Sequence, residues 1–147
     1  MTPDTAALYV AEPPASYLFR PSLVVDCSVL SSAMFNEGSR LQAIQLMSGK
    51  TLHAPSLLDH EIVSVALKKS RMGWPAGAVF DAMADYAVQD IEMHSTEMRA
   101  QYELASQYGL SGYDAAYLWL AAALKAPLAT FDKKLARAAK VHLAKLS

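Results

Sequence analysis

Four acidic side chains stand at positions where they could hold a metal ion. Asp26 and Asp132 each end a short apolar run, Asp114 opens an almost wholly apolar helical stretch, and Glu61 falls on or beside the apolar stripe of another predicted helix. A carboxylate in such surroundings is costly unless it is paired or coordinates a cation. The types and positions of these residues therefore indicate a candidate site for divalent metal.

Each acid also has a simpler explanation. Asp26 and Asp132 could cap the helices that follow them, Asp114 could be the acid of a capping box, and Glu61 could pair with a buried base. Taken together these explanations weaken, because in a parallel sheet the carboxyl ends of the strands and the helix N-termini that follow them converge on one edge, where ligands bind. Asp26, Asp114 and Asp132 belong to that edge.

The ion predicted for such a site is Mg²⁺ or Mn²⁺. Several carboxylates in a small volume repel one another, and a hard cation with oxygen ligands relieves this repulsion. Zinc is a poorer match, because the sequence shows no zinc-type spacing among its four histidines and its cysteine, namely His53, His60, His94, His142 and Cys27.

Two hydroxyl residues, Ser28 and Thr130, each lie two positions from one of these acids. Either could add a hydroxyl ligand or a hydrogen bond to a carboxylate, or could be an ordinary cap or strand-end residue. The chain has no Gly-rich phosphate loop, no Gly-x-Ser-x-Gly and no Cys-x-x-Cys. What remains is metal-assisted hydrolysis of an anionic substrate, in which the metal lowers the pKa of water and neutralises charge on a phosphate.

Strands that alternate with helices must position these residues. The first strand is continuously apolar, as in a strand buried on both faces, so we expect it at the centre of the sheet. Strand 88–93 has polar alternation and is expected near an edge. Expected strands are 23–25, 52–54, 88–93, 128–131 and a possible last one at 141–146; expected helices are 28–34, 40–47, one opening at 56, 75–86, 95–108, 115–124 and 133–140. This alternation predicts an α/β fold with a parallel sheet covered on both faces.

Local signals mark several of the helix ends. Ser56 and Ser111 are each followed three residues later by an acid, Asp59 and Asp114, so both are expected to begin helices with a capping box. Gly109 is expected to end the helix before the second of these.

Length and composition favour a single domain that forms a homo-oligomer. Of the 147 residues, 53% are hydrophobic and 18% charged, which excludes disorder and leaves more apolar surface than a monomer readily hides. Residues 1–21 hold four of the seven prolines and are expected to form an irregular arm, with the domain at 22–147. The single cysteine, the lack of a signal-like start and the absence of an apolar run of about 20 residues predict a cytoplasmic protein without a membrane span.

The charges are unevenly distributed, although the formal net charge is only -1. Residues 81–103 carry six acids and one base, whereas 125–147 carry six bases and one acid. The basic region could attract a polyanion, or it could be an ordinary solvated helix face.

Four stretches of the chain resemble a PIN domain, and are most similar to the VapC-type toxins of toxin–antitoxin pairs. They are VVDCSVL at 24–30, APSLLDHEI at 54–62, YGLSGYDAAY at 108–117 and LATFDKKL at 128–135. The resemblance implies a three-layer α/β/α sandwich and a ribonuclease site with Mg²⁺ or Mn²⁺ held by Asp26, Glu61, Asp114 and Asp132. It also implies a homodimer and an antitoxin partner.

With RNA as the implied substrate, the basic residues that follow Asp132 are predicted to hold it beside the acids; these are Lys133, Lys134, Arg137 and Lys140. The alternative from another class is a non-catalytic PIN-like module that binds RNA or a partner protein. A phosphoacceptor receiver domain also clusters acids on a parallel sheet, but there the acids have a different order along the chain and no helix supplies a counterpart of Glu61.

Overall fold

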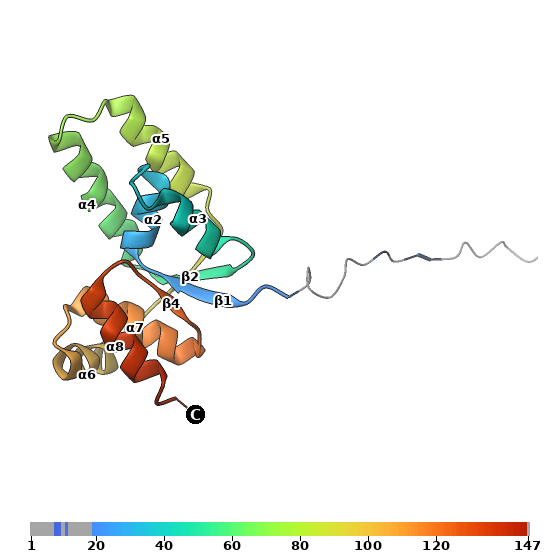
Figure 1. Ribbon diagram of the computed structural model, residues 1–147, viewed down its shortest axis with the longest axis vertical. Helices are drawn as coiled ribbons and strands as arrows, with labels where there is room; N and C mark the ends of the chain where they lie inside the picture. Colours follow the sequence, from blue (N-terminus) through green and yellow to red (C-terminus); the bar gives the residue numbers. More distant parts are fainter. Residues whose placement is uncertain (1–7, 10, 12–18, 147) are drawn as a thin grey trace, which may run out of the picture.

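A four-stranded parallel sheet forms the middle layer of the molecule (Figure 1). The computed structural model describes residues 8–9, 11 and 19–146, so most of the predicted arm lies outside the described residues. The strands are β1 (Ser22–Val25), β2 (Thr51–Pro55), β3 (Ile91–His94) and β4 (Leu128–Ala129), and they lie in the order β3-β2-β1-β4 with every pairing parallel. The predicted central first strand and edge third strand are both confirmed.

Helices cover both faces of this sheet, which makes the predicted three-layer sandwich (Figure 1). One layer holds α2 (Cys27–Met34), α3 (Arg40–Met47), α4 (Leu58–Arg71) and α5 (Ala76–Ala87). The other holds α6 (Met98–Tyr108), α7 (Gly112–Leu124) and α8 (Lys133–Leu143). Among the described residues no helix combines the length and apolarity needed to cross a membrane.

The core is built where the apolar runs of the sequence meet. Leu23, Val24 and Val25 of β1 are each almost wholly inaccessible to solvent, as expected for a central strand with helices on both sides. Helix α7 packs on β1 and β2 and is apolar on most of its surface. The first strand and α7 are therefore rigid supports for whatever stands at their ends.

Two of the predicted helix ends are confirmed at atomic detail. The Ser111 hydroxyl accepts a hydrogen bond from the Asp114 amide at 3.1 Å and so caps α7. Gly109 ends α6 in the left-handed conformation, with φ of 63°, and its amide donates to the Ala105 carbonyl.

Two other predictions are wrong. Ser56 does not cap α4, because the chain stays extended through Pro55 and both the amide and the hydroxyl of Ser56 donate to the His94 carbonyl, continuing the pairing of β2 with β3. Helix α4 begins at Leu58 instead. The last strand predicted at 141–146 is absent, since α8 continues to Leu143 and ends in a turn.

Two further boundaries shift. The third strand occupies 91–94 rather than 88–93, because Val88 is the exposed C-cap of α5. Helix α6 begins at Met98 rather than at 95, since the Glu97 side chain caps it by accepting from the amides of Arg99 and Ala100.

Candidate active site

Asp26 lies at the carboxyl end of β1, where it is 5% exposed. One carboxylate oxygen, Oδ1, accepts from the Val29 amide at 3.2 Å and from the Ser28 hydroxyl at 2.6 Å. The other, Oδ2, accepts from the Thr130 hydroxyl. Asp26 therefore caps α2, as its simpler explanation predicts. Ser28 and Thr130 also hold its carboxylate in a fixed orientation.

Asp132 lies near Asp26, beyond the end of the neighbouring strand β4. It follows β4 and caps α8, because its Oδ1 accepts from the Leu135 amide at 2.8 Å. Its own amide donates to the Thr130 hydroxyl at 2.9 Å, so this one hydroxyl joins both acids. The Phe131 amide donates to the Ser28 hydroxyl at 2.9 Å, which ties the two strand ends together a second time.

Glu61 and Asp114 face this pair from helices in opposite layers. Glu61 lies in the first turn of α4 and is partly buried, and its Oε1 accepts from the Tyr117 hydroxyl at 2.6 Å. Tyr117 belongs to α7, three residues after Asp114 and therefore on the same side of that helix. The hydrogen bond from Tyr117 to Glu61 thus joins the two helical layers at the acidic edge. The partner of Glu61 is therefore a hydroxyl group and not the buried base that was the alternative.

Each of the four acids interacts electrostatically with at least two of the others. The pKa values of Asp26, Glu61 and Asp114 are each raised, mainly by burial and further by the charges of neighbouring acids. The charge of Asp132 raises the pKa values of Asp26 and Asp114. The charges of Asp26 and Asp114 in turn raise the pKa of Glu61. Neighbouring carboxylates that repel one another offer oxygen ligands that suit a hard divalent cation.

Comparisons with known proteins identify the family to which this fold belongs. The model of the PIN domain matches residues 23–141. The chain belongs to the PIN-domain family. It is 35% identical over 122 residues to VapC ribonuclease Mb0985 of Mycobacterium bovis, covering 77% of this chain and 87% of that protein. Ribonuclease VapC1 of Mycobacterium tuberculosis is 31% identical over 121 residues, covering 78% and 89%.

Solved structures share the fold at lower identity. PAE2754 from Pyrobaculum aerophilum superposes with a TM-score of 0.64 at 20% identity, covering 85% of this chain and 88% of that one. Mycobacterium tuberculosis VapC20, described as a toxin that cleaves the sarcin–ricin loop, has a TM-score of 0.59 at 16% identity, covering 80% and 95%. Membership of the PIN family implies the use of divalent metal, and the acidic edge offers ligands for it.

Beside the acids of this PIN domain the surface is hollowed. A cavity of about 530 Å³ is lined by Glu61 together with Cys27, Leu57, His60, Ser64, Val65 and Tyr113. Burial and the neighbouring carboxylates raise the pKa of Cys27 to about 12, so the thiol is neutral near pH 7 and is a poor nucleophile. Cys27 is therefore a poor candidate for the reactive group at this edge.

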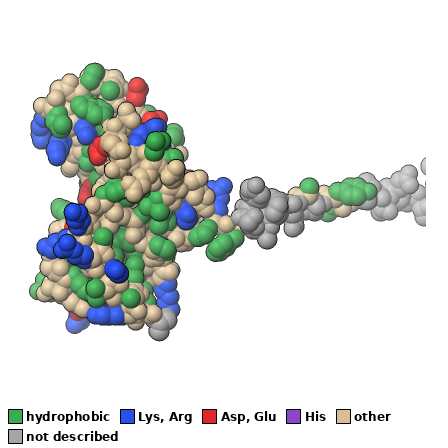
Figure 2. Space-filling view, in the orientation of Figure 1, with side chains coloured by type: hydrophobic (Ala, Val, Ile, Leu, Met, Phe, Trp, Pro, Cys, Tyr) green, Lys and Arg blue, Asp and Glu red, His purple; other side chains and the backbone are tan. Residues whose placement is uncertain are grey.

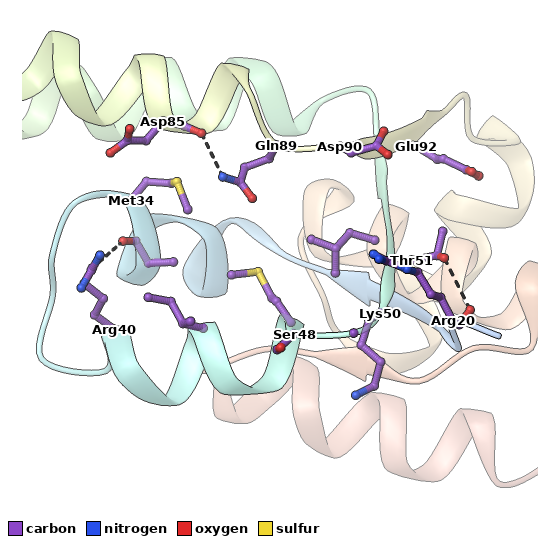
Figure 3. Close-up of a pocket in the computed structure, with 15 residues that line it drawn as sticks. Arg20, Met34, Arg40, Ser48, Lys50, Thr51, Asp85, Gln89, Asp90 and Glu92 are labelled. Atoms are coloured by element: carbon purple, nitrogen blue, oxygen red, sulfur yellow. Dashed lines mark hydrogen bonds between the residues drawn. The ribbon is translucent and has the colours of Figure 1, made fainter. Parts of the chain in front are cut away.

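A second hollow, of about 560 Å³, lies elsewhere on the PIN domain and holds none of the four acids (Figure 3). It is bordered by α3, α5 and the start of β2. Its charged lining is mixed, with three bases opposite three acids, namely Arg20, Arg40 and Lys50 opposite Asp85, Asp90 and Glu92. Because the charges balance, this hollow shows no preference for an anion and does not compete with the acidic edge as a candidate active site.

The predicted basic residues lie on α8 and are all exposed; they are Lys133, Lys134, Arg137 and Lys140. Among these four, Lys134 interacts with the acids, because its charge partly offsets the rise in the pKa of Asp114. Figure 2 shows Lys and Arg side chains gathered on the lower helical layer near the waist between the two layers, with Asp or Glu side chains in the recess.

Tyr117 is a functional candidate that the sequence does not single out, because it lies within an almost wholly apolar helix. We expect Tyr117→Phe to fold normally and to weaken Mg²⁺ binding by about 10–100-fold, since it removes the hydrogen bond that orients Glu61. The measurement is the Mg²⁺ concentration at half-maximal RNA cleavage. Tyr108→Phe is the matched control, as its hydroxyl contacts His142 instead; equal Mg²⁺ dependence in the two variants would contradict the role of Tyr117.

Proposed function

We propose that this chain is a metal-dependent endoribonuclease and the toxin of a toxin–antitoxin pair. The observation that carries the proposal is the set of four electrostatically coupled acids at the carboxyl edge of a PIN-domain sheet, in a chain whose relatives are named VapC ribonucleases. RNA is the substrate and Mg²⁺ or Mn²⁺ the cofactor. The ligands are assigned to Asp26, Glu61, Asp114 and Asp132.

The residues of this chain have distinct roles in the proposed reaction. Bound at the acids, the cation would neutralise charge on the phosphate and lower the pKa of the attacking water. Asp26 and Asp114 are assigned as direct ligands. Ser28 and Thr130 fix the Asp26 carboxylate through hydrogen bonds to both of its oxygens, which limits the rearrangement needed on binding.

The experiment that tests the function is cleavage of structured and single-stranded RNAs by the purified chain, with Mg²⁺, with Mn²⁺ and with chelator. Cleavage is expected with either metal and not with chelator. RNA binding without cleavage of any substrate under all of these conditions would favour the alternative, a non-catalytic PIN-like module.

The α8 cations are proposed to hold the RNA backbone beside the acids. Replacing Lys133 and Lys134 with alanine should weaken RNA binding and reduce the slope of log affinity against log salt by about 1.4, because each phosphate contact to a single strand contributes about 0.7. The measurement is RNA binding over a range of salt concentrations in the Asp114→Asn background, which prevents cleavage.

A matched control removes two other exposed cations. Lys68 and Arg71 lie in the last turn of α4, at the opposite end of that helix from Glu61. Their replacement with alanine should leave the salt dependence nearly unchanged. Equal losses in the two double variants would assign the α8 residues to a solvated face.

The proposed setting is a cytoplasmic homodimer bound by an antitoxin protein. Its support is the exposed apolar surface of α4 and α5, where Val63, Leu67 and Phe80 are 46%, 49% and 70% exposed. These side chains border an apolar groove between the two helices, and patches of this kind are typical of protein interfaces. Size measurement over a range of concentrations tests the dimer, and a monomer throughout would contradict it.

A further inference from the structure

A second cluster of potential metal ligands lies on the β2–β3 side of the sheet, away from β4. It consists of His53 on β2 and of Glu92 and His94 on β3, and one ligand atom from each lies within 4.8 Å of the others. The acids Asp26 and Asp132 follow β1 and β4, whereas these three residues stand on the β2–β3 pair at the opposite edge. The cluster is therefore separate in the sheet from the acidic edge.

The register of the strands explains why the three side chains meet. His53 pairs with Glu92, and Pro55 pairs with His94. Side chains two residues apart on a strand point to the same face, and partners in a parallel pair share that face. The three ligands therefore project from the same side of the sheet, although 41 residues separate the two histidines in sequence.

The two distances from His53 Nδ1 to the other ligand atoms are close to those of a small tetrahedral site. His53 Nδ1 lies 2.9 Å from His94 Nε2 and 3.4 Å from Glu92 Oε2. Metal–ligand bonds of about 2.0–2.2 Å at tetrahedral angles place ligand atoms about 3.3–3.5 Å apart. The carboxylate is already at this spacing, and the histidine nitrogens need to separate by about 0.4 Å, which the partly exposed His94 at the end of the edge strand can accommodate.

His53 is also held in the orientation that a metal ligand requires. The side chain is buried, at 6% exposure, and its Nε2 lies 3.2 Å from the Ser22 hydroxyl on β1. With the Nε2 hydrogen donated to Ser22, the Nδ1 lone pair points at the other two ligands. Metal-binding histidines characteristically use their second nitrogen in this way.

We propose that His53, Glu92 and His94 bind one divalent transition metal ion of the Zn²⁺ class, with a water molecule in the fourth position. Two imidazoles and one carboxylate form a ligand set suited to Zn²⁺ and less suited to Mg²⁺. The ion ties the edge strand β3 to β2. It also steadies the segment that leads into α4, because the His94 carbonyl accepts from the amide and hydroxyl of Ser56.

The test uses the full chain, stripped of metal and then titrated with Zn²⁺ or with Co²⁺ as a spectroscopic probe, in the Asp114→Asn background with excess Mg²⁺. The expected result is one tightly bound Zn²⁺, the visible absorption of four-coordinate Co²⁺, and a higher melting temperature with Zn²⁺. His94→Gln and Glu92→Gln are expected to weaken Zn²⁺ binding at least tenfold and to remove this absorption. Both positions are partly or largely exposed, so these variants avoid the folding risk of replacing the buried His53.

His60→Gln is the matched control, since it removes an exposed histidine outside the cluster and is expected to leave Zn²⁺ binding unchanged. Equal Zn²⁺ affinity in wild type, His94→Gln and Glu92→Gln would overturn the proposal, as would binding that is lost in Asp26→Asn and kept in His94→Gln. Absence of bound Zn²⁺ in the wild-type chain would overturn it too and would leave a hydrogen-bonded His–His–Glu network.

Discussion

Asp26→Asn and Asp114→Asn are each expected to leave a folded protein whose metal-dependent RNA cleavage has fallen by about 10²-fold or more. Stabilisation of transition-state charge by a bound cation amounts to several kcal/mol, and each 1.36 kcal/mol corresponds to a factor of ten in rate. Asparagine has nearly the shape of aspartate but lacks the charge that holds the cation. The measurement is the cleavage rate of one RNA at saturating Mg²⁺, with circular dichroism to establish the fold.

Asp81→Asn is the matched control, because Asp81 is an exposed aspartate of α5 outside the acidic edge. It should cleave like wild type, with the same dependence on Mg²⁺. Cleavage that persists in chelator, or that survives in both site variants, would discard the metal mechanism and indicate a contaminant or another site.

The acids could be predicted from the sequence because their positions depend on local structure. Asp26 directly follows β1 and Asp132 comes three residues after β4, and each caps the next helix. Asp114 lies in the first turn of a capped helix. Once the sheet is parallel, these features alone bring the three residues to one edge. Glu61 could be singled out as well, since an acid beside an apolar stripe requires a compensating partner.

Tyr117 and the histidine cluster depend on contacts that no local pattern encodes. The Tyr117 hydroxyl meets Glu61 across the sheet from the opposite helical layer, over 56 residues of sequence. The pairing of His53 with Glu92 depends on the register of two strands joined through two helices. A search for zinc-type spacing, which looks for ligands a few residues apart, cannot find such a pair.

The two wrong element predictions share a cause, which is that a local signal was overruled by its neighbours. Ser56 has the sequence of a helix cap, but pairing with β3 keeps its backbone extended and occupies its hydroxyl. The 141–146 stretch contains apolar residues that could form a strand. Leu143 instead continues the stripe of Leu135 and Ala139 at spacings of four, so the helix extends over it.

The metal-free protein is expected to lose stability as the pH rises above about 4. Burial and mutual repulsion raise the pKa values of Asp26, Glu61 and Asp114 above their ordinary values of 3.8, 4.5 and 3.8. Between the unfolded and folded pKa values the folded state binds more protons, so the free energy of unfolding falls with increasing pH. The stabilising contribution is complete below pH about 4 and is lost as the pH passes the raised folded values.

Thermal unfolding in chelator, followed from pH 4 to pH 8, measures this loss, and Asp114→Asn separates it from other titrations. Removing one repelling charge should raise the melting temperature near pH 7 by about 2–4 °C, the equivalent of about 1 kcal/mol for a chain of this size, and should reduce the fall with pH. Mg²⁺ should raise the melting temperature of wild type more than that of the variant, because binding to the folded state is stabilising. A variant less stable than wild type in chelator at pH 7 would show that the acids do not repel one another, and the argument for a cation at this edge would lose its electrostatic basis.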